Sequence, residues 1–274
     1  MHRENPGPPV LWAVINLTPD SFYAGSRATV GEAIARAEKM FADGAAVIDV
    51  GAESTRPGAS PVSAAAQSEV LLSFLDKYRS HFGDTFMRRI SVDTRELPVM
   101  QQVAEWGVGY INDVSGGSPE IYRFIAESGL EYVLMHTQGN PQEMQKAPTY
   151  NDVCAEVLAY LQLRTALLKE SGVKAEKIIW DTGIGFGKTV EHNLALIAAH
   201  ARFREFGYRV LAGVSRKSFI GRVLGQDDAA DRLVGTLTTQ IYLTLHGLEI
   251  LRVHDVKEMA DALRMIAAIK QHEL

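Results

Sequence analysis

Residues 30–50 read VGEAIARAEKMFADGAAVIDV, and this stretch contains one helix followed by one strand. In the first part the apolar residues recur at intervals of three and four, at Ile34, Ala37, Met40 and Phe41. That spacing indicates one face of an α-helix. Residues 46–50, AVIDV, form a short apolar run, which is typical of a buried strand. The stretch therefore predicts a helix over 30–41 and a strand over 46–50.

The same alternation continues along the whole chain. Strand-like runs occupy residues 10–15, 46–50, 89–92, 109–111, 131–135, 177–180, 209–214 and 249–253. Strands that alternate with helices pair in parallel through right-handed crossovers, and eight such units close a barrel. No linker-like segment divides the chain, so we predict an α/β fold with one (β/α)₈ TIM-barrel domain over residues 1–274. Asp152 and Asp255 are predicted helix N-caps, with a helix over 152–168.

The composition excludes several classes of protein. Against 33 Asp and Glu there are 28 Lys and Arg, a net charge of −5, which argues against nucleic acid or an anionic membrane as a partner. The single cysteine, Cys154, excludes an internal disulfide, and the pattern places it in the middle of a helix as an inert thiol. The first ten residues do not resemble a signal peptide, and no apolar run is long enough to span a membrane. We therefore expect a cytoplasmic enzyme.

Polar side chains follow all eight predicted strands, where a barrel of this kind builds its active site. They are Asn16, Asp49, Asp93, Asn112, His136, Asp181, Lys217 and the pair Arg252 and His254. One such residue alone could simply cap the next helix. Eight in eight strands favour a convergent polar pocket.

These polar residues divide into two chemical sets. Carboxylates and an amide suit the N–H-rich edge of a nitrogen heterocycle: Asp49, Asp93, Asn112 and Asp181. Cationic side chains suit an anion such as a phosphorylated substrate: Arg56, Arg216, Lys217, Arg252 and His254. The alternative is that some of the cations face solvent or pair with the acids.

Three loops add to this interpretation. Residues 16–22, NLTPDSF, place a neutral amide oxygen after the first strand, and such an oxygen beside a polyphosphate suits Mg²⁺. Residues 53–58, ESTRPG, carry a hydroxyl and a guanidinium. Residues 183–188, GIGFGK, fit neither nucleotide-loop pattern, and we interpret their glycines as letting a flat ligand approach the backbone. Ser215 and the histidines lack the spacing of a nucleophilic or zinc site.

In these motifs and their order, the chain resembles the dihydropteroate synthase family over nearly its whole length. The matching segments are NLTPDSF (16–22), IDVGAESTRPGA (48–59), SVDT (91–94), INDVSGG (111–117), LMHTQGNPQEMQ (134–145), DTGIGFGKT (181–189), SRKSFIGR (215–222) and RVHDV (252–256). The resemblance implies a TIM barrel that condenses 6-hydroxymethyl-7,8-dihydropterin diphosphate with 4-aminobenzoate in folate biosynthesis. It also implies that Mg²⁺ is required, that 7,8-dihydropteroate and pyrophosphate are released, and that sulfonamides compete with 4-aminobenzoate.

The resemblance also implies roles for individual residues. The pterin would be held by Asp93, Asn112, Asp181 and Lys217, with Asp49 and Met135 nearby. Asn16 would bind Mg²⁺, and Arg252 and His254 would bind the diphosphate. The aminobenzoate side would comprise Thr55, Arg56, Pro57, Ser218, Phe186 and Lys217. The residues expected to take part in catalysis are Lys217, Asp93, Asp181, Arg252 and His254.

Some residues depart from the family pattern, and two other functions stay open. Ala52, Thr182 and Ile184 replace residues usual in the family, as do the residues after NLTPDSF. The alternatives are a methyltetrahydrofolate-dependent methyltransferase and a non-catalytic pterin-binding paralogue. The resemblance also suggests a homodimer formed through the last helices, whose apolar faces core burial would explain equally well: Leu237, Ile241, Leu245, Met259, Leu263 and Ile266.

Overall fold

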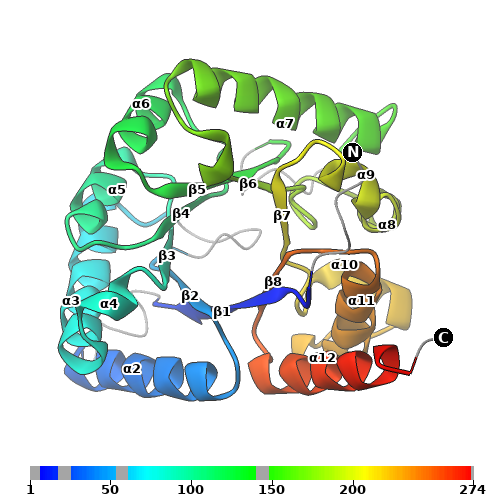
Figure 1. The fold of residues 1–274 in the computed structure, drawn as a ribbon, viewed down its shortest axis with the longest axis horizontal. Helices are drawn as coiled ribbons and strands as arrows, with labels where there is room; N and C mark the ends of the chain where they lie inside the picture. Colours follow the sequence, from blue (N-terminus) through cyan, green and yellow to red (C-terminus); the bar gives the residue numbers. More distant parts are fainter. Residues whose placement is uncertain (1–6, 18–25, 54–60, 140–147, 273–274) are drawn as a thin grey trace.

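The computed structural model describes residues 7–17, 26–53, 61–139 and 148–272, and it contains a closed parallel barrel (Figure 1). Its strands pair in chain order, and the last pairs with the first. They are β1 (Val10–Asn16), β2 (Val47–Gly51), β3 (Ile90–Asp93), β4 (Tyr110–Asp113), β5 (Glu131–Met135), β6 (Ile178–Asp181), β7 (Arg209–Ala212) and β8 (Ile250–Val253). The predicted (β/α)₈ fold is confirmed.

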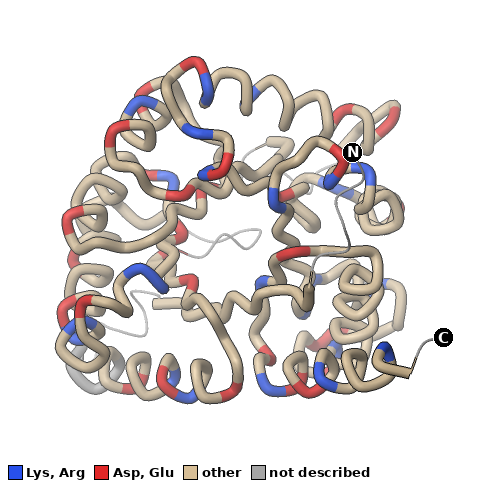
Figure 2. Tube along the Cα trace, in the orientation of Figure 1, with Lys and Arg blue, Asp and Glu red and all other residues tan. Residues whose placement is uncertain are grey.

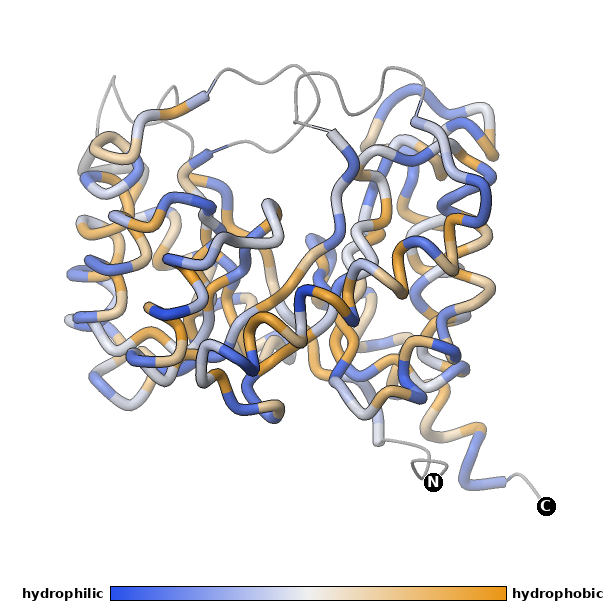
Figure 3. The backbone as a smooth tube through the Cα atoms, turned by 90° about the horizontal axis from the view of Figure 1, so that it is seen from above, coloured by the Kyte–Doolittle hydropathy of each residue, from blue (hydrophilic) through white to orange (hydrophobic). Residues whose placement is uncertain are grey.

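Helices surround the barrel in a ring (Figure 1). They are α2 (Ser26–Ala42), α3 (Ala64–Phe82), α4 (Asp84–Met87), α5 (Leu97–Ala104), α6 (Pro119–Ser128), α7 (Val153–Glu170), α8 (Val190–Ala198), α9 (His200–Arg204), α10 (Ser218–Leu224), α11 (Leu233–Leu245) and α12 (Val256–Lys270), with 3₁₀ turns at Ala175–Lys177 and Ala229–Arg232. From above, hydrophobic and hydrophilic residues alternate along these helices, as expected when one face packs on the strands (Figure 3). Lys and Arg are interspersed with Asp and Glu around the ring (Figure 2).

The core has two parts, separated by the barrel wall. The larger part lies between the strands and the helices. A smaller inner cluster fills the lower barrel and consists of Trp12, Val47, Val133, Ile179, Leu211 and Ile250. Because side chains alternate between the two faces of a strand, the residue two positions after each of these also points into the barrel. The inner cluster therefore lies directly below the side chains at the carboxyl ends of the strands, which form the mouth of the barrel.

Two sequence predictions about helix starts had different outcomes. Asp152 caps α7 as predicted, accepting hydrogen bonds from the backbone N–H groups of Cys154 (2.9 Å) and Ala155 (3.0 Å). Cys154 therefore lies in the first turn of α7, and its predicted place in the middle of a helix was wrong. Burial nevertheless raises the pKa of its thiol. Asp255 precedes α12 but makes no side-chain cap bond, because its carboxylate pairs with Arg216 instead.

The apolar residues of the last two helices are only partly available for contact with another subunit. Met259 is fully buried in the core, and Leu237, Ile241 and Leu263 pack against that core. Leu245 is exposed, as are three residues outside our predicted set, Val234, Met265 and Ile269. Core burial therefore explains much of the predicted face, and the homodimer stays a prediction.

Two glycines with the same backbone angle test how tightly the mouth is packed. Gly183 and Gly129 have φ of 66° and 67°, respectively. A Cβ on Gly183 would overlap the carbonyl oxygen of His136, whereas one on Gly129 would meet nothing within 4 Å. We expect Gly129→Ala to cost about 1–2 kcal/mol and Gly183→Ala about 3 kcal/mol or more. Urea unfolding of both variants measures the difference, and equal losses would contradict the packing described.

Candidate active site

Strand alternation brings most of the predicted site residues to one place. Asp49, Met135, Asp181 and Arg252 lie two positions after a residue of the inner cluster. Asn112 is in register with Val133 of that cluster, and Asp93 is in register with Asn112, so all six residues face the barrel interior. Met135 aligns with Asp181, and Asp93 aligns with both Gly51 and Asn112. The residues that meet in this way at the carboxyl ends of the strands are Asp49, Asp93, Asn112, Met135, Asp181 and Arg252.

A guanidinium connects two of the carboxylates. Arg252 Nε donates to Asp49 Oδ2 at 2.6 Å, and Arg252 Nη2 donates to Asp93 Oδ2 at 2.9 Å. Asn112 Nδ2 donates to the same Asp49 oxygen at 3.1 Å. Asp49 is fully buried beneath Arg252, whose side chain is 21% exposed. Gly51 aligns with Asp93, and its missing side chain makes room there, since a Cβ would lie 3.2 Å from that of Asp93.

Burial changes the proton affinity of the ionisable groups in this mouth. It raises the pKa of Asp93 to about 7, against the opposing effect of Arg252 and with a contribution from the negative charge of Asp49. It raises the pKa of Asp181 as well, although the Lys217 cation opposes this shift. It lowers the pKa of Lys217 to about 8, which the charge of Asp181 opposes. Perturbed carboxylates and a perturbed amine in one mouth are typical of a functional site.

Two acceptors in the same region are left without a partner in the described residues. Asp49 Oδ1 and Asn112 Oδ1 are buried and accept no hydrogen bond there. Unsatisfied buried acceptors are costly, so they favour a water or a ligand that supplies N–H groups. Asp181 Oδ1 accepts a hydrogen bond from the N–H of Gly183 at 2.7 Å. The acceptor-rich side of the mouth fits the predicted N–H-rich heterocycle.

Lys217 lies against the glycine-rich loop. Its Nζ donates to the carbonyl oxygen of Ile184 and lies 4.6 Å from the ring centroid of Phe186, a cation–π contact. A Cβ on Gly185 would come within 2.9 Å of Lys217 Cδ, and those on Gly183 and Gly187 would overlap backbone atoms of the neighbouring loop. In the structure the missing side chains of these glycines therefore leave room for protein atoms. The sequence interpretation gave a different reason for the glycines, namely close approach of a flat ligand to the backbone. Ser218 begins α10 and is exposed.

The cationic set is not the separate anion pocket that the sequence suggested. Arg252 lies among the carboxylates, as described above. Arg216 forms a two-pronged ion pair with Asp255, at 2.7 and 2.9 Å, and has a left-handed backbone with φ of 57°. His254 Nδ1 lies 3.0 Å from the hydroxyl of Ser215. The open alternative, that cations pair with acids, therefore holds for two arginines. Arg56 lies outside the described residues.

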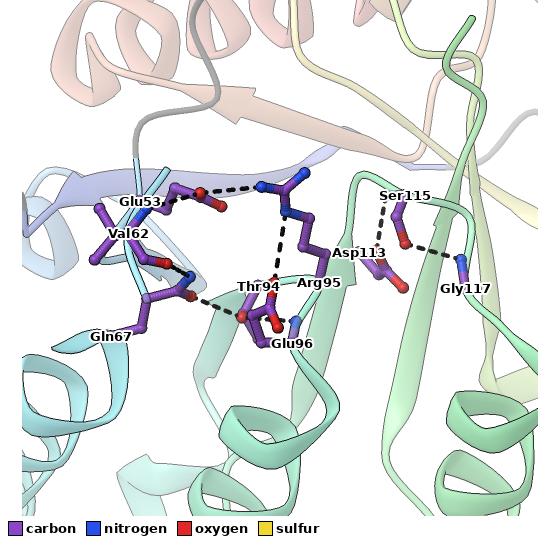
Figure 4. Close-up of polar contacts among 9 residues, drawn as sticks. All are labelled: Glu53, Val62, Gln67, Thr94, Arg95, Glu96, Asp113, Ser115 and Gly117. Carbon is purple, nitrogen blue, oxygen red and sulfur yellow. Dashed lines mark hydrogen bonds and ion pairs between the residues drawn. The ribbon is translucent and has the colours of Figure 1, made fainter. Parts of the chain in front are cut away.

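Thr55 and Pro57 also lie outside the described residues, but both ends of their loop are described (Figure 4). Glu53 Oε1 accepts hydrogen bonds from the backbone N–H of Val62 and from Arg95 Nη2, each at 3.2 Å. One carboxylate therefore joins the two ends of the loop and fixes them to the segment after β3. Sequence reasoning assigned no role to Glu53.

A second set of contacts lies beside the first (Figure 4). The Gln67 amide donates to the carbonyl of Val62 (2.9 Å) and accepts from the hydroxyl of Thr94 (3.0 Å). Behind β4, Asp113 accepts from the N–H of Ser115 at 2.7 Å. These partners are far apart in the sequence or ordinary in type, so the sequence does not indicate that they pair. Thr94, within SVDT, and the pair Asp113 and Ser115, within INDVSGG, belong to segments that match the family, but sequence reasoning assigned none of them a role.

Asn16 is the last residue of β1 and is exposed at the mouth, next to Gly51. In the described part of the chain, no group of three or more His, Cys, Asp or Glu could hold a metal ion. A single amide oxygen fits an ion that keeps its waters and takes its other ligands from a substrate, as Mg²⁺ does. Within the same described residues, no helix is long and apolar enough to cross a membrane.

Comparisons with known proteins agree with this geometry. Residues 12–254 match a family model described as a pterin binding enzyme. The chain is 40% identical over 262 residues to dihydropteroate synthase of Escherichia coli K12, covering 95% of this chain and 91% of that protein. The structure is similar to that of Xanthomonas albilineans dihydropteroate synthase with 4-aminobenzoic acid (TM-score 0.87, 34% identity, 96% and 93% covered).

Two further solved structures have other ligands. The Yersinia pestis dihydropteroate synthase, in a sulfonamide drug complex, has a TM-score of 0.86 at 32% identity, with 96% and 95% of the two chains covered. The Xanthomonas albilineans enzyme in complex with 7,8-dihydropteroate has a TM-score of 0.84 at 31% identity, with 96% and 94% covered.

The ion pairs of Arg252 make a prediction about stability. Arg252→Met removes the partner of Asp49 and leaves a fully buried carboxylate uncompensated, which should cost about 3–5 kcal/mol of unfolding free energy. Adding Asp49→Asn should recover part of that loss, because the orphaned charge is then gone. Denaturant unfolding of the two single variants and the double variant measures the coupling. Purely additive losses would show that the contact does not stabilise the fold.

Proposed function

The chain belongs to the dihydropteroate synthase family of pterin-binding enzymes, and we propose that it condenses 6-hydroxymethyl-7,8-dihydropterin diphosphate with 4-aminobenzoate. The amine nitrogen forms a bond to the pterin methylene carbon, the carbon–oxygen bond to the diphosphate breaks, and pyrophosphate leaves, while the amine nitrogen releases one of its protons to solvent. One observation of the structure carries this proposal. The buried acceptors around Asp49, Asp93 and Asn112 lie at the same barrel mouth as the Lys217 ammonium on the ring of Phe186.

The acceptor side of the mouth would bind the pterin. Its ring N–H groups match the oxygens of Asp93, Asp181 and Asn112, and Met135 would cover an apolar edge. As the diphosphate departs, positive charge develops on the methylene carbon and spreads into the pterin. Ionised Asp93 and Asp181 lie where they would stabilise that charge electrostatically.

The cationic groups would hold the diphosphate and the second substrate. His254 and Arg252 would bind the departing anion, and Arg252 would in addition keep Asp49 and Asp93 in place. Lys217 and Phe186 would form one wall of the aminobenzoate pocket, beside Ser218. By the resemblance, Thr55, Arg56 and Pro57 would belong to the same side. No nucleophilic side chain is required, because alignment of two substrates and a charged leaving group account for the rate.

The test of the function is the dependence of pyrophosphate release on 4-aminobenzoate. The purified protein with pterin diphosphate and Mg²⁺ should release pyrophosphate only when 4-aminobenzoate is added, in equal amounts to the pteroate formed. A methyltransferase or a non-catalytic pterin-binding protein would release none under either condition. That result would refute the proposal.

Mg²⁺ dependence is proposed through Asn16. Bound to the diphosphate, the ion would neutralise charge on the leaving group, while Asn16 supplies one neutral oxygen ligand. Asn16→Ala should raise the Mg²⁺ concentration needed for half-maximal turnover, with little change in thermal stability because the residue is exposed at a strand end. Asn16→Asp, which keeps an oxygen ligand, is the matched comparison. An unaltered Mg²⁺ titration in the alanine variant would remove Asn16 from the metal site.

The pKa shifts predict a narrow pH optimum. Asp93 has to be ionised, so kcat/KM should rise with pH through about 7; Lys217 has to be charged, so it should fall through about 8. Replacing the amine in Lys217→Arg should move the falling limb to higher pH, because a guanidinium keeps its proton. Rate profiles of both proteins from pH 5 to 10 would check this. A falling limb that persists unchanged in the variant would belong to another group.

A further inference from the structure

Lys188, the last residue of the glycine-rich loop, is almost completely buried. Its Nζ donates to the carbonyl oxygens of Phe186 (2.9 Å) and His136 (3.4 Å) and lies 3.0 Å from His136 Nδ1. In the described residues no carboxylate lies within ion-pair distance of it, and its side chain is 2% exposed. Burying an ammonium charge in this way is costly, so these contacts call for a reason beyond packing.

The contact with His136 has a defined direction. Burial, together with the charge of Lys188, lowers the pKa of His136 to about 3, so its imidazole is neutral. A neutral ring whose Nδ1 faces an ammonium accepts through that nitrogen and carries its proton on Nε2. Burial also lowers the pKa of Lys188, to about 7, while the nearby charge of Asp181 favours the ammonium and that of Lys217 disfavours it.

Lys188 thereby connects the end of β5 to the aminobenzoate wall. It holds the Phe186 carbonyl, the Phe186 ring lies under the Lys217 ammonium, and the Ile184 carbonyl accepts from the same ammonium. The other side of the loop is held separately, by Asn193, whose Oδ1 accepts from the N–H of Gly185 at 2.6 Å.

We propose that Lys188 is a positioning residue, which fixes the glycine-rich loop to His136 so that Phe186 and Lys217 keep the geometry required by 4-aminobenzoate. The residue touches neither substrate and acts through the loop. The proposal rests on the assignment of Phe186 and Lys217 to the aminobenzoate side.

The main test is Lys188→Met, which keeps the length of the side chain and removes its donors. The KM for 4-aminobenzoate should rise about tenfold or more, the loss expected for charge-assisted hydrogen bonds. The affinity for a pterin without phosphate, measured by calorimetry, should stay within about threefold. Lys174→Met, at an exposed lysine outside the site, should change neither quantity. An unchanged KM, or equal losses for both ligands, would overturn the proposal.

A second pair of variants decides the matter should Lys188→Met fail to fold. His136→Asn places an amide oxygen where Nδ1 accepts and should keep the KM for 4-aminobenzoate near its original value. His136→Leu removes the acceptor and should raise it. The same KM in the two variants would also overturn the proposal. Phe186→Leu tests the underlying assignment separately. An unaltered KM for 4-aminobenzoate in this variant would show that Phe186 does not line the aminobenzoate site, and the role proposed for Lys188 would be refuted with it.

Discussion

The guanidinium of Arg252 is the contact on which the arrangement of the mouth depends. Two buried carboxylates, Asp49 and Asp93, point into the same narrow barrel, and without a cation between them their charges would repel each other in a poorly solvated place. Arg252 comes from β8 and the acids from β2 and β3, so this single side chain joins three strands around the closure of the barrel. The polar contacts of Asn112 build on that arrangement.

The same contact explains why binding and leaving-group chemistry can share one mouth. In the proposed reaction, the arginine that holds Asp49 and Asp93 would lie next to the diphosphate attached to the heterocycle. The anion and the acids therefore compete for its charge, and binding of a diphosphate would weaken the hold of Arg252 on Asp93.

The fold could be predicted from the sequence because it depends on short-range patterns. Apolar runs and helical spacing repeat eight times, and the strand ends identify the inward-facing residues by simple alternation. Chemical roles at those ends were also accessible for residues such as Asp181, whose type and place agree. The family resemblance supplied the rest of the expected site, including residues outside the described part of the chain.

The sequence could not predict which residue each charged or polar side chain contacts in the folded chain. Asp255 looks like a helix cap and Arg216 looks like an anion ligand, yet the two form an ion pair because folding brings them together across 39 positions of the chain. Arg252 was assigned to the anion side, although its nearest groups are acids from distant strands. Lys188 and Glu53 lie in segments that match the family, yet the sequence does not indicate their contacts. Lys188 contacts two backbone carbonyls and an imidazole, and Glu53 contacts a backbone N–H and a guanidinium, which only the folded chain places beside them.

Strand alternation limits how such a barrel can change over evolutionary time. Insertion or deletion of a single residue within β3 would turn Asp93 towards the helices and bring a residue that now faces the helices into the barrel interior, so the carboxylate would be lost from the mouth. Substitution at an inward position, by contrast, alters one functional group and leaves its neighbours in place. Length variation is therefore expected in the loops beyond the strand ends. New activities on this scaffold are expected to arise by substitution of side chains at fixed inward-facing positions.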